Sequence, residues 1–250
     1  GVGWEWENIY NYCQSKGIKF CIWGIEDVLN YPIWMEQTVN NCHQYFTTVE
    51  EFIPLAKQKF NKNIKLLQFG VNHEFHKPNI PNKELYPWDV TLMGNNYSSR
   101  YDKMKWFLQP LLDNNYNIAI YGQDWWIQRE REFHIAEYIN VYKGHLHYDN
   151  LPTLYSTVPV VLGLNCSDLS TSQCSMRNWE YGGSAYNSCL VSFYTKSQEI
   201  YFGDMIYLPK NSQETINMVN EVLNMSDKQR IEKSNKLREF VYRNHNYIDR

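Results

Sequence analysis

Short apolar runs alternate with longer amphipathic stretches along the 250 residues of this chain. Five or six nearly continuous apolar residues are typical of strands that are buried on both faces, as in parallel sheets. Amphipathic segments between such runs predict βαβ units, with helices on both sides of the sheet. The pattern therefore predicts an α/β fold. Strands are expected at residues 18–24, 45–49, 64–70, 89–94, 117–122, 141–146, 160–165, 189–193 and 205–209.

Capping residues and apolar spacing predict three helices. Asn211 with Glu214, and Ser226 with Gln229, have the three-residue separation of a helix cap, and each pair precedes an apolar stripe. A third helix, over residues 101–112, carries its large apolar side chains on one face. The end of the chain is therefore expected to hold two consecutive helices.

The chain is predicted to divide into two lobes. Residues 76–88 contain three prolines and no apolar periodicity, which is typical of a linker. We therefore assign residues 1–80 to a first lobe and residues 81–250 to a second. Because the chain has no initiator Met and enters helix-like sequence at once, we expect the first lobe to continue upstream of Gly1.

The charge balance limits the kinds of binding partner to expect, and the cysteines indicate the redox compartment. The 24 basic and 27 acidic residues nearly balance, and no run of basic residues appears. A long nucleic acid or an anionic membrane surface is therefore not an expected partner. The balanced net charge is still compatible with a local basic groove. The six cysteines include no CxxC pair, which predicts free thiols in a reducing, cytoplasmic compartment. Cys21 and Cys189 lie in apolar runs and are expected to be buried.

The residues that follow the strand predicted at 89–94 are candidates for ligand binding. Ligands of open parallel sheets bind beyond the carboxyl ends of the strands, where helices begin. Here Gly94 allows close approach of the backbone, Asn95 and Asn96 supply hydrogen-bond donors, and Arg100 suits a bidentate phosphate contact. The alternative is an ordinary strand-to-helix turn, which has the same composition.

Two further strand ends carry candidate residues. Gly122 ends the strand predicted at 117–122 and is placed for close approach of the backbone to a ligand, and Gln123 follows it. Of the two tryptophans that come next, we expect one to face a ligand while the other packs; the spacing does not decide which, and Trp125 is kept as the candidate. His145 and His147 would share one face of a strand and suit a metal ion, but no third ligand lies nearby. Backbone contacts to a nucleobase, or plain surface positions, are therefore favoured for these histidines.

Arg177 and Glu180 lie three residues apart on a predicted short helix, so they share a face. One interpretation is a surface ion pair that contributes at most ~1 kcal/mol to stability. The other assigns Arg177 to a diphosphate and Glu180 to the hydroxyl pair of a sugar or ribose, which a carboxylate accepts well. The spacing alone leaves both interpretations open.

Six short motifs occur in order along the chain. They are Trp23-Gly-Ile-Glu26-Asp27, the stretch from Gln68 to Pro78, Asp89 to Gly94 with Tyr97 and Arg100, Leu151-Pro-Thr-Leu-Tyr followed by a strand that ends in Asn165, Arg177-x-x-Glu180, and His245-x-Tyr247-x-x-Arg250. In this order they resemble the spore-maturation (CgeB-type) glycosyltransferase-like family and, more loosely, the retaining glycosyltransferases of the B fold.

The resemblance implies a glycosyltransferase B fold of two Rossmann-like lobes. It implies transfer of a sugar from a nucleotide-sugar donor, a UDP-sugar, to a glycan, protein or surface-polymer acceptor, without a metal or other cofactor. By position, Glu180 would hold the donor ribose and Arg177 would lie near the diphosphate. Gly94 and Asn95 would face the phosphates, and the base would stack near Leu146.

The resemblance adds residues on both sides of the reaction. Asn165 and Ser172 fall on the donor side, and many retaining enzymes have the first of two glutamates where Ser172 stands. On the acceptor side, Glu26, Asp27 and His73 are the candidate bases if the reaction inverts configuration. A helix cap is an equally natural role for Asp27.

Two alternatives come from other classes of function. One is a non-catalytic B-fold protein that binds a nucleotide or glycan, or that builds a particle or surface layer; Ser172 in place of a glutamate supports it. The other is sugar transfer to modified DNA bases, which this fold also performs. The acidic net charge of −3 argues mildly against DNA.

Overall fold

The computed structural model describes residues 4–25, 32–96, 100–128, 138–164 and 176–249. Within these residues the chain forms two compact units, of which one ends at Phe69 and the other begins at Gly70. The sequence-based boundary lay at residue 80, but residues 70–80 group with the second unit. Their backbone bonds to it, since the N–H of Val71 donates to the carbonyl of His245 (2.8 Å).

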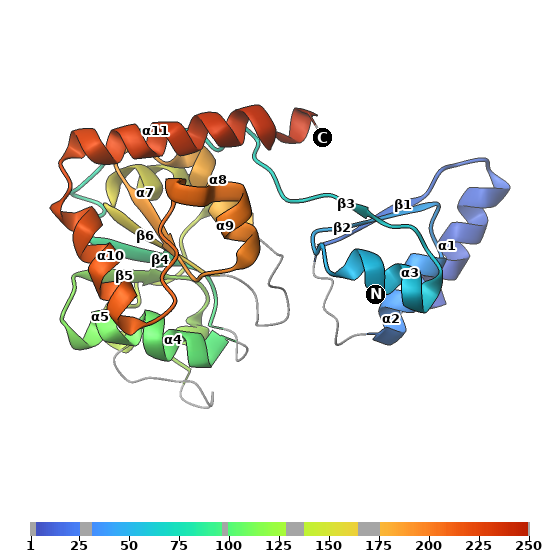
Figure 1. Ribbon diagram of the computed structural model, residues 1–250, viewed down its shortest axis with the longest axis horizontal. Helices are drawn as coiled ribbons and strands as arrows, with labels where there is room; N and C mark the ends of the chain where they lie inside the picture. The colour runs from blue at the N-terminus through green and yellow to red at the C-terminus, as the bar shows by residue number, and fades with distance from the viewer. Residues whose placement is uncertain (1–3, 26–31, 97–99, 129–137, 165–175, 250) are drawn as a thin grey trace. The chain divides into compact units, whose positions relative to one another are not determined.

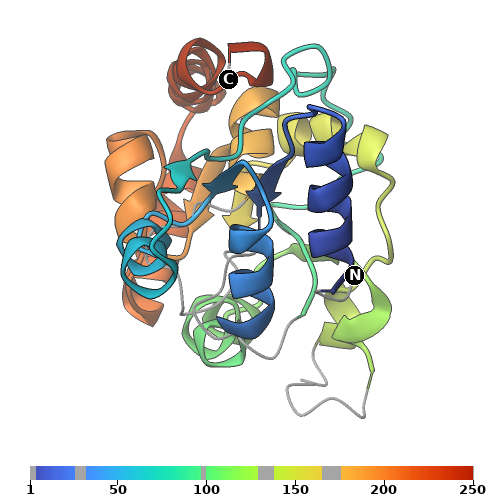
Figure 2. The ribbon, with the colours of Figure 1, turned by 90° about the vertical axis from the view of Figure 1, so that its right-hand side faces the viewer.

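The first unit is built on a small parallel sheet. Its strands are β1 (Cys21–Gly24), β2 (Gln44–Thr47) and β3 (Lys65–Leu66), which pair in that order. The helices are α1 (Trp4–Ser15), α2 (Pro32–Asn40) and α3 (Phe52–Phe60). Helix α2 contacts both α1 and α3, as Figure 2 shows. The three strands predicted in this part of the chain are confirmed, although each is shorter than the apolar run that predicts it.

The burial predicted for Cys21 is wrong, and that for Cys189 is confirmed. Cys21 is exposed because β1 is an edge strand whose first residue projects toward solvent. Cys189 is buried in the second unit, and this burial raises the pKa of its thiol to about 11. Among the described residues Cys13 and Cys42 are also free thiols, and Cys42 is buried.

The second unit has a four-stranded parallel sheet between two layers of helices. The strands β4 (Val90–Met93), β5 (Ile118–Tyr121), β6 (Val160–Gly163) and β7 (Cys189–Ser192) pair in the order β5-β4-β6-β7, and every residue in them is buried. This burial confirms the α/β prediction. One layer holds α4 (Tyr101–Phe107), α5 (Gln109–Asp113) and α10 (Ser212–Asn224), and the other holds α7 (Leu151–Thr157), α8 (Met176–Ser184) and α11 (Asp227–Asn244), as Figure 1 shows.

The strand order of the second unit creates a switch point between β4 and β6. The chain leaves β4 toward β5 on one side, and it leaves β5 toward β6 on the other. The strands that follow β4 and β6 in the sequence, β5 and β7, therefore lie on opposite sides of this point, and open α/β sheets bind their ligands at the carboxyl edge beside such a switch point. None of the helices that the structure describes is long and apolar enough to span a membrane.

The strands predicted at residues 141–146 and 205–209 do not form. Residues 138–141 are helix α6 (Tyr138–Val141), and Tyr142 pairs with β5 only through a single bridge to Ile120. Gly144 has a φ of 89°, which interrupts the extended backbone there. In the run at 205–209, Tyr207 makes one bridge, and Pro209 has no N–H to extend the pairing.

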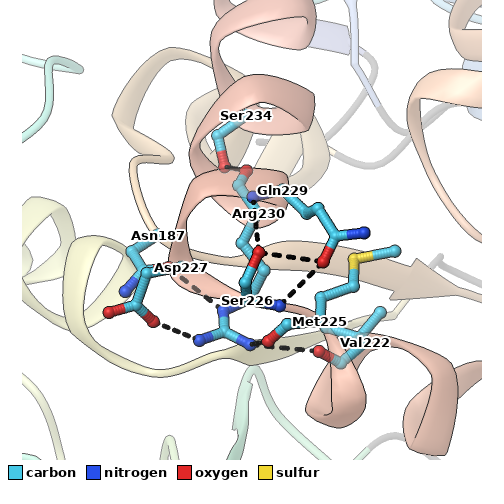
Figure 3. Close-up of polar contacts among 8 residues, drawn as sticks. All are labelled: Asn187, Val222, Met225, Ser226, Asp227, Gln229, Arg230 and Ser234. Carbon is cyan, nitrogen blue, oxygen red and sulfur yellow. Dashed lines mark hydrogen bonds and ion pairs between the residues drawn. The ribbon is translucent and has the colours of Figure 1, made fainter.

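The predicted helix caps are confirmed. Asn211 Oδ1 accepts the backbone N–H of Glu214 (2.9 Å) at the start of α10. Ser226 and Gln229 form a complete capping box at the start of α11, which is drawn in Figure 3. The helix predicted at residues 101–112 forms as α4 and α5, because a proline in the first turn of α5 has no N–H to continue the ladder.

Arg230 closes the corner between α10 and α11 (Figure 3). Its guanidinium donates to the carbonyls of Val222 (3.2 Å) and Met225 (2.5 Å) at the end of α10. It also donates to Asn187 Oδ1 (3.0 Å) and pairs with Asp227. The last carbonyls of a helix have no partner within the helix, so Arg230 supplies the donors that this buried corner needs.

We expect Arg230→Met to lower the free energy of unfolding by about 2–4 kcal/mol, because the Met225 carbonyl and Asn187 lose the guanidinium donor and Asp227 loses its ion-pair partner. Chemical denaturation followed by circular dichroism measures the loss. Arg243→Met is the matched control, since Arg243 lies on the same helix in an exposed i,i+4 pair with Glu239. It should cost at most about 0.5 kcal/mol, and equal losses for the two variants would contradict the role given to Arg230.

Candidate functional site

The loops after β4 and β5 are fastened to each other at the carboxyl edge of the sheet. The Asn95 side-chain oxygen accepts the backbone N–H of Gln123 (3.0 Å), and the Asn95 carbonyl accepts from the Arg100 guanidinium (2.7 Å). The indole N–H of Trp126 donates to the carbonyl of Gly94 (2.8 Å). These bonds hold Gly94 and Asn95 against the residues that follow β5.

Gly122 is required by packing within these loops. A Cβ atom at this position would lie 2.1 Å from the carbonyl oxygen of Gly94. Trp126 is the fully buried one of the two adjacent tryptophans, and Trp125 is half-buried.

Asn96 is 1% exposed, and its amide nitrogen has no hydrogen-bond partner among the residues that the structure describes. The loop therefore contains an unused donor next to the switch point.

The first turns of α8 lie against the carboxyl ends of β6 and β7. The side-chain amide of Asn178 donates to Ser192 Oγ (3.1 Å) at the end of β7 and to Gln198 Oε1 (2.5 Å). A Cβ atom on Gly163, the last residue of β6, would lie 2.7 Å from Asn178 Oδ1. These buried contacts hold the start of α8, and with it Arg177 and Glu180, at the ligand-binding edge of the sheet.

The Glu180 carboxylate is buried and bonded on both oxygens. Its side chain is 3% exposed. The Tyr148 hydroxyl donates to Oε1 (2.7 Å), and the Arg177 guanidinium donates to Oε2 (2.7 Å). A buried carboxylate needs such donors, because burial of an unpaired charge is costly. The Arg177 side chain is 31% exposed, so its positive charge also reaches the surface of the site.

His76 extends this hydrogen-bond chain. Its Nε2 lies 2.7 Å from the Tyr148 hydroxyl and 4.0 Å from Glu180 Oε1. Its Nδ1 accepts the backbone N–H of Asn72 (3.1 Å), so the neutral ring carries its proton on Nε2. We call His76, Tyr148, Arg177 and Glu180 the Glu180 cluster.

The surroundings of the Glu180 cluster fix its protonation. Burial lowers the pKa of His76 below its ordinary value, and Arg177 adds to this, while Glu180 opposes it. Burial, followed by the charge of Glu180, raises the pKa of Tyr148. At neutral pH the imidazole is therefore neutral and the phenol keeps its proton, which it donates to the carboxylate.

Aromatic packing supports Tyr148 on the side away from its hydroxyl bonds. The ring stacks on Phe75, with centroids 4.9 Å apart and planes at 9°. The Arg177 guanidinium lies 5.4 Å from the centre of the Tyr148 ring. Tyr148 is nevertheless 39% exposed, so the cluster has an accessible side.

The structure brings some of the predicted site residues together. Arg177 and Glu180 meet in the cluster, and the loop after β4 joins that after β5. His73 instead contacts Asn246 through its Nδ1 (2.8 Å). His145 is exposed, and Leu146 is buried. Four predicted residues lie outside the described part of the chain: Glu26, Asp27, Asn165 and Ser172.

The described residues include no group of three side chains suited to a metal ion. His147 caps the short 3₁₀ turn Tyr148–Asn150 through its Nδ1, which accepts the N–H of Asp149 (3.4 Å). The structure therefore gives this histidine a surface capping role.

Sequence reasoning missed His76, Tyr148 and Phe75. Phe75 and His76 lie within the motif from Gln68 to Pro78, and Tyr148 directly follows His147, but none of the three was assigned to the site. The only available signal was the number of aromatic and imidazole side chains near the linker. Their meeting with Glu180 depends on the path of residues 70–80 across the second unit, which the sequence pattern does not specify.

A family model described as "Glycosyl transferase-like" matches residues 98–250 of the chain. Among curated proteins none matches it in sequence.

Several solved structures are similar in fold. A mutant of the T4 phage enzyme BGT in complex with UDP-glucose is 19% identical with a TM-score of 0.57, over 91% of this chain and 70% of the other. An alpha-glucosyltransferase in complex with UDP-glucose and DNA containing an abasic site is 11% identical with a TM-score of 0.63, over 96% and 73%. An E. coli protein bound with UDP-2-fluoro glucose is 12% identical with a TM-score of 0.62, over 94% and 67%. These likenesses confirm the predicted fold class.

The low pKa of His76 predicts a pH dependence of stability. The unfolded chain takes up a proton near the ordinary pKa of 6.5, whereas the folded cluster resists it. Stability is therefore full above this pH and falls below it, until the folded state also binds the proton. We expect the melting temperature of the wild type to fall more between pH 7.5 and pH 5.5 than that of His76→Gln.

His147→Gln is the control for this experiment, because it removes an exposed histidine and should keep the wild-type profile. If His76→Gln and His147→Gln had the same pH profile, the buried neutral state of His76 would be excluded. Differential scanning fluorimetry at constant ionic strength measures all three proteins.

Proposed function

Because the chain belongs to the glycosyl transferase-like family, we propose that it transfers a sugar from a UDP-sugar donor to a glycan, protein or surface-polymer acceptor. The observation that carries the proposal is the Glu180 carboxylate, buried in the first turns of α8 and held between Tyr148 and Arg177. Glu180 lies within residues 98–250, which the family model matches, and the helix that carries it is bonded to the carboxyl end of β7.

Glu180 suits the ribose of the donor. A carboxylate has about four acceptor sites, and Tyr148 and Arg177 use one on each oxygen. The remaining sites can accept two neighbouring hydroxyl groups, which is the arrangement of the 2′ and 3′ hydroxyls of a ribose. Hydrogen bonds from a ligand to a charged acceptor contribute about 1.5–3 kcal/mol each.

Arg177 and the start of α8 suit the diphosphate. During transfer the bond from the sugar C1 to the phosphate oxygen breaks, and C1 bonds to the acceptor oxygen, whose proton is lost. The nucleoside diphosphate leaves with additional negative charge. A partly exposed guanidinium and the N-terminus of a nine-residue helix stabilise that charge, so we propose that the reaction needs no metal ion.

The loop after β4 is the second element that we assign to the donor phosphates. Gly94 and Asn95 are fixed by their bonds to the loop after β5, and the Asn96 amide is a buried donor without a partner in the described residues. Arg100 holds this loop through the Asn95 carbonyl. Residues that are already held by protein contacts bind a phosphate at a smaller entropic cost than residues that must be ordered on binding.

The candidate residues on the acceptor side are proposed from the sequence. An inverting reaction needs a base for the acceptor proton, and Glu26, Asp27 and His73 are the candidates, whereas a retaining reaction needs none. Within the family we assign the chain to the spore-maturation (CgeB-type) branch, because six of its motifs occur here in the same order.

A DNA base is the second candidate acceptor. One similar structure is an alpha-glucosyltransferase with UDP-glucose and DNA bound, which favours testing DNA directly. Binding to duplex DNA that weakens steeply between 50 and 200 mM salt would support this acceptor. Binding that does not change with salt would leave the glycan or protein acceptor.

The donor site is tested by thermal unfolding with UDP, GDP, CDP, ADP, TDP and their common sugars, in EDTA. A nucleotide at one hundred times its dissociation constant should stabilise the fold by ~2.7 kcal/mol, which raises the melting temperature by several degrees. We expect UDP and UDP-sugars to give the largest shift and Glu180→Gln to remove it. Glu239→Gln, an exposed change on α11, should leave the shift intact.

Release of free UDP from a UDP-sugar, measured in the same samples, separates an enzyme from a binding protein. Turnover that depends on Glu180 supports the enzyme, whereas UDP binding without any turnover supports the non-catalytic alternative. A shift that appears only when Mn²⁺ replaces EDTA would contradict metal independence. No shift with any nucleotide would contradict the donor site itself.

A further inference from the structure

We infer that His76 is a positioning residue for the donor ribose, and that it acts through Tyr148 on the Glu180 carboxylate. The inference rests on the proposed function of Glu180 as the ribose acceptor. The observation behind it is a continuous line of hydrogen bonds from the segment that follows the first unit to the carboxylate: Asn72 N–H to His76, His76 to Tyr148, and Tyr148 to Glu180.

The direction of this line is fixed by chemistry. Because His76 Nδ1 accepts from the Asn72 N–H, the ring proton of the neutral imidazole is on Nε2 and points to the Tyr148 oxygen. A phenol has a single proton, so once its oxygen accepts from His76, that proton is given to Glu180. Without His76 the hydroxyl can rotate about its C–O bond and donate elsewhere.

The consequence for Glu180 is a fixed carboxylate plane. Tyr148 occupies one acceptor site on Oε1, and Arg177 occupies one on Oε2, each at 2.7 Å. Two donors on two oxygens determine the rotation of the group, and therefore the direction of the acceptor sites that are left for the ribose. A positioned group of this kind distinguishes a ligand with both hydroxyls from one that lacks a hydroxyl.

His76 is itself fixed against the helix that carries Glu180. The hydroxyl of Tyr242, on α11, lies 2.8 Å from the carbonyl oxygen of His76 and 3.0 Å from that of Gly183, on α8, so its single proton is shared between the two acceptors. A Cβ atom on Gly183 would lie 2.7 Å from the His76 carbonyl oxygen, so the two backbones touch. The histidine and the carboxylate therefore belong to one packed group.

Two substitutions test the roles of the two ring nitrogens of His76 one at a time. In His76→Asn the side-chain oxygen takes the place of Nδ1 and can still accept from Asn72, but nothing reaches Tyr148. In His76→Gln the side-chain amide takes the place of Nε2 and can still donate to Tyr148. Tyr148→Phe removes the hydroxyl and keeps the ring that stacks on Phe75.

The measurement is the ratio of the affinities for UDP and 2′-deoxy-UDP, taken by isothermal titration calorimetry on the full chain. For the wild type we expect UDP to bind roughly thirtyfold more tightly, because one hydrogen bond to a charged acceptor is lost with the hydroxyl. In His76→Asn and Tyr148→Phe the ratio should fall to about threefold or less. In His76→Gln it should stay within about threefold of the wild type.

A purely structural role for His76 predicts a different result. The variants would then lose affinity for UDP and 2′-deoxy-UDP by the same factor, and an unchanged ratio in both His76→Asn and Tyr148→Phe overturns the inference. A wild type that binds UDP but does not distinguish it from 2′-deoxy-UDP overturns it as well. A wild type that binds no UDP overturns the proposed donor site together with the inference, and this failure is recognised before any variant is measured.

Discussion

A buried carboxylate has to be surrounded by donors, and this requirement organises the second unit around Glu180. Its side chain is 3% exposed, and the removal of one partner from a buried ion pair typically costs about 3–5 kcal/mol. The donors come from separate parts of the chain, namely Tyr148 before α7 and Arg177 on α8 itself. Residues 70–80 pack against the same unit and bring His76 to within 2.7 Å of the Tyr148 hydroxyl.

The sheet explains why this cluster lies where a ligand binds. The strand order β5-β4-β6-β7 opens a switch point between β4 and β6, and the buried amide of Asn178 fastens the start of α8 to the carboxyl end of β7. On the other side of the switch point, Asn95 bonds to Gln123 and the Gly94 carbonyl bonds to Trp126. The described residues on both sides are therefore held by contacts within the protein, which lowers the entropic cost of binding a flexible nucleotide.

The sequence was sufficient for features that depend on local patterns. Continuous apolar runs predicted β4 to β7, capping pairs predicted the starts of α10 and α11, and the spacing of Arg177 and Glu180 predicted a shared face. The family resemblance then gave that shared face a chemical meaning. Each of these signals is local, because the residues that carry it lie close together in the sequence.

The features that the sequence did not reveal depend on contacts between distant residues. The prediction that Cys21 is buried was wrong, because the position of β1 at a sheet edge is a property of the whole sheet. His76 and Glu180 are 104 residues apart, and their meeting through Tyr148 requires the packed linker. The structure adds a packing reason for Gly122, since a Cβ atom there would lie 2.1 Å from the carbonyl oxygen of Gly94, while its approach to a ligand stays a prediction.

A crystal structure with UDP bound tests the role of Glu180 most directly. We expect the ribose hydroxyls within about 3.2 Å of the Glu180 carboxylate oxygens, a usual hydrogen-bond distance, with the diphosphate at Arg177 and the start of α8. The bonds from Tyr148 and Arg177 to the carboxylate should be retained. A nucleotide that binds elsewhere, while Glu180 contacts only Tyr148 and Arg177, would contradict the assignment and leave the cluster with a structural role.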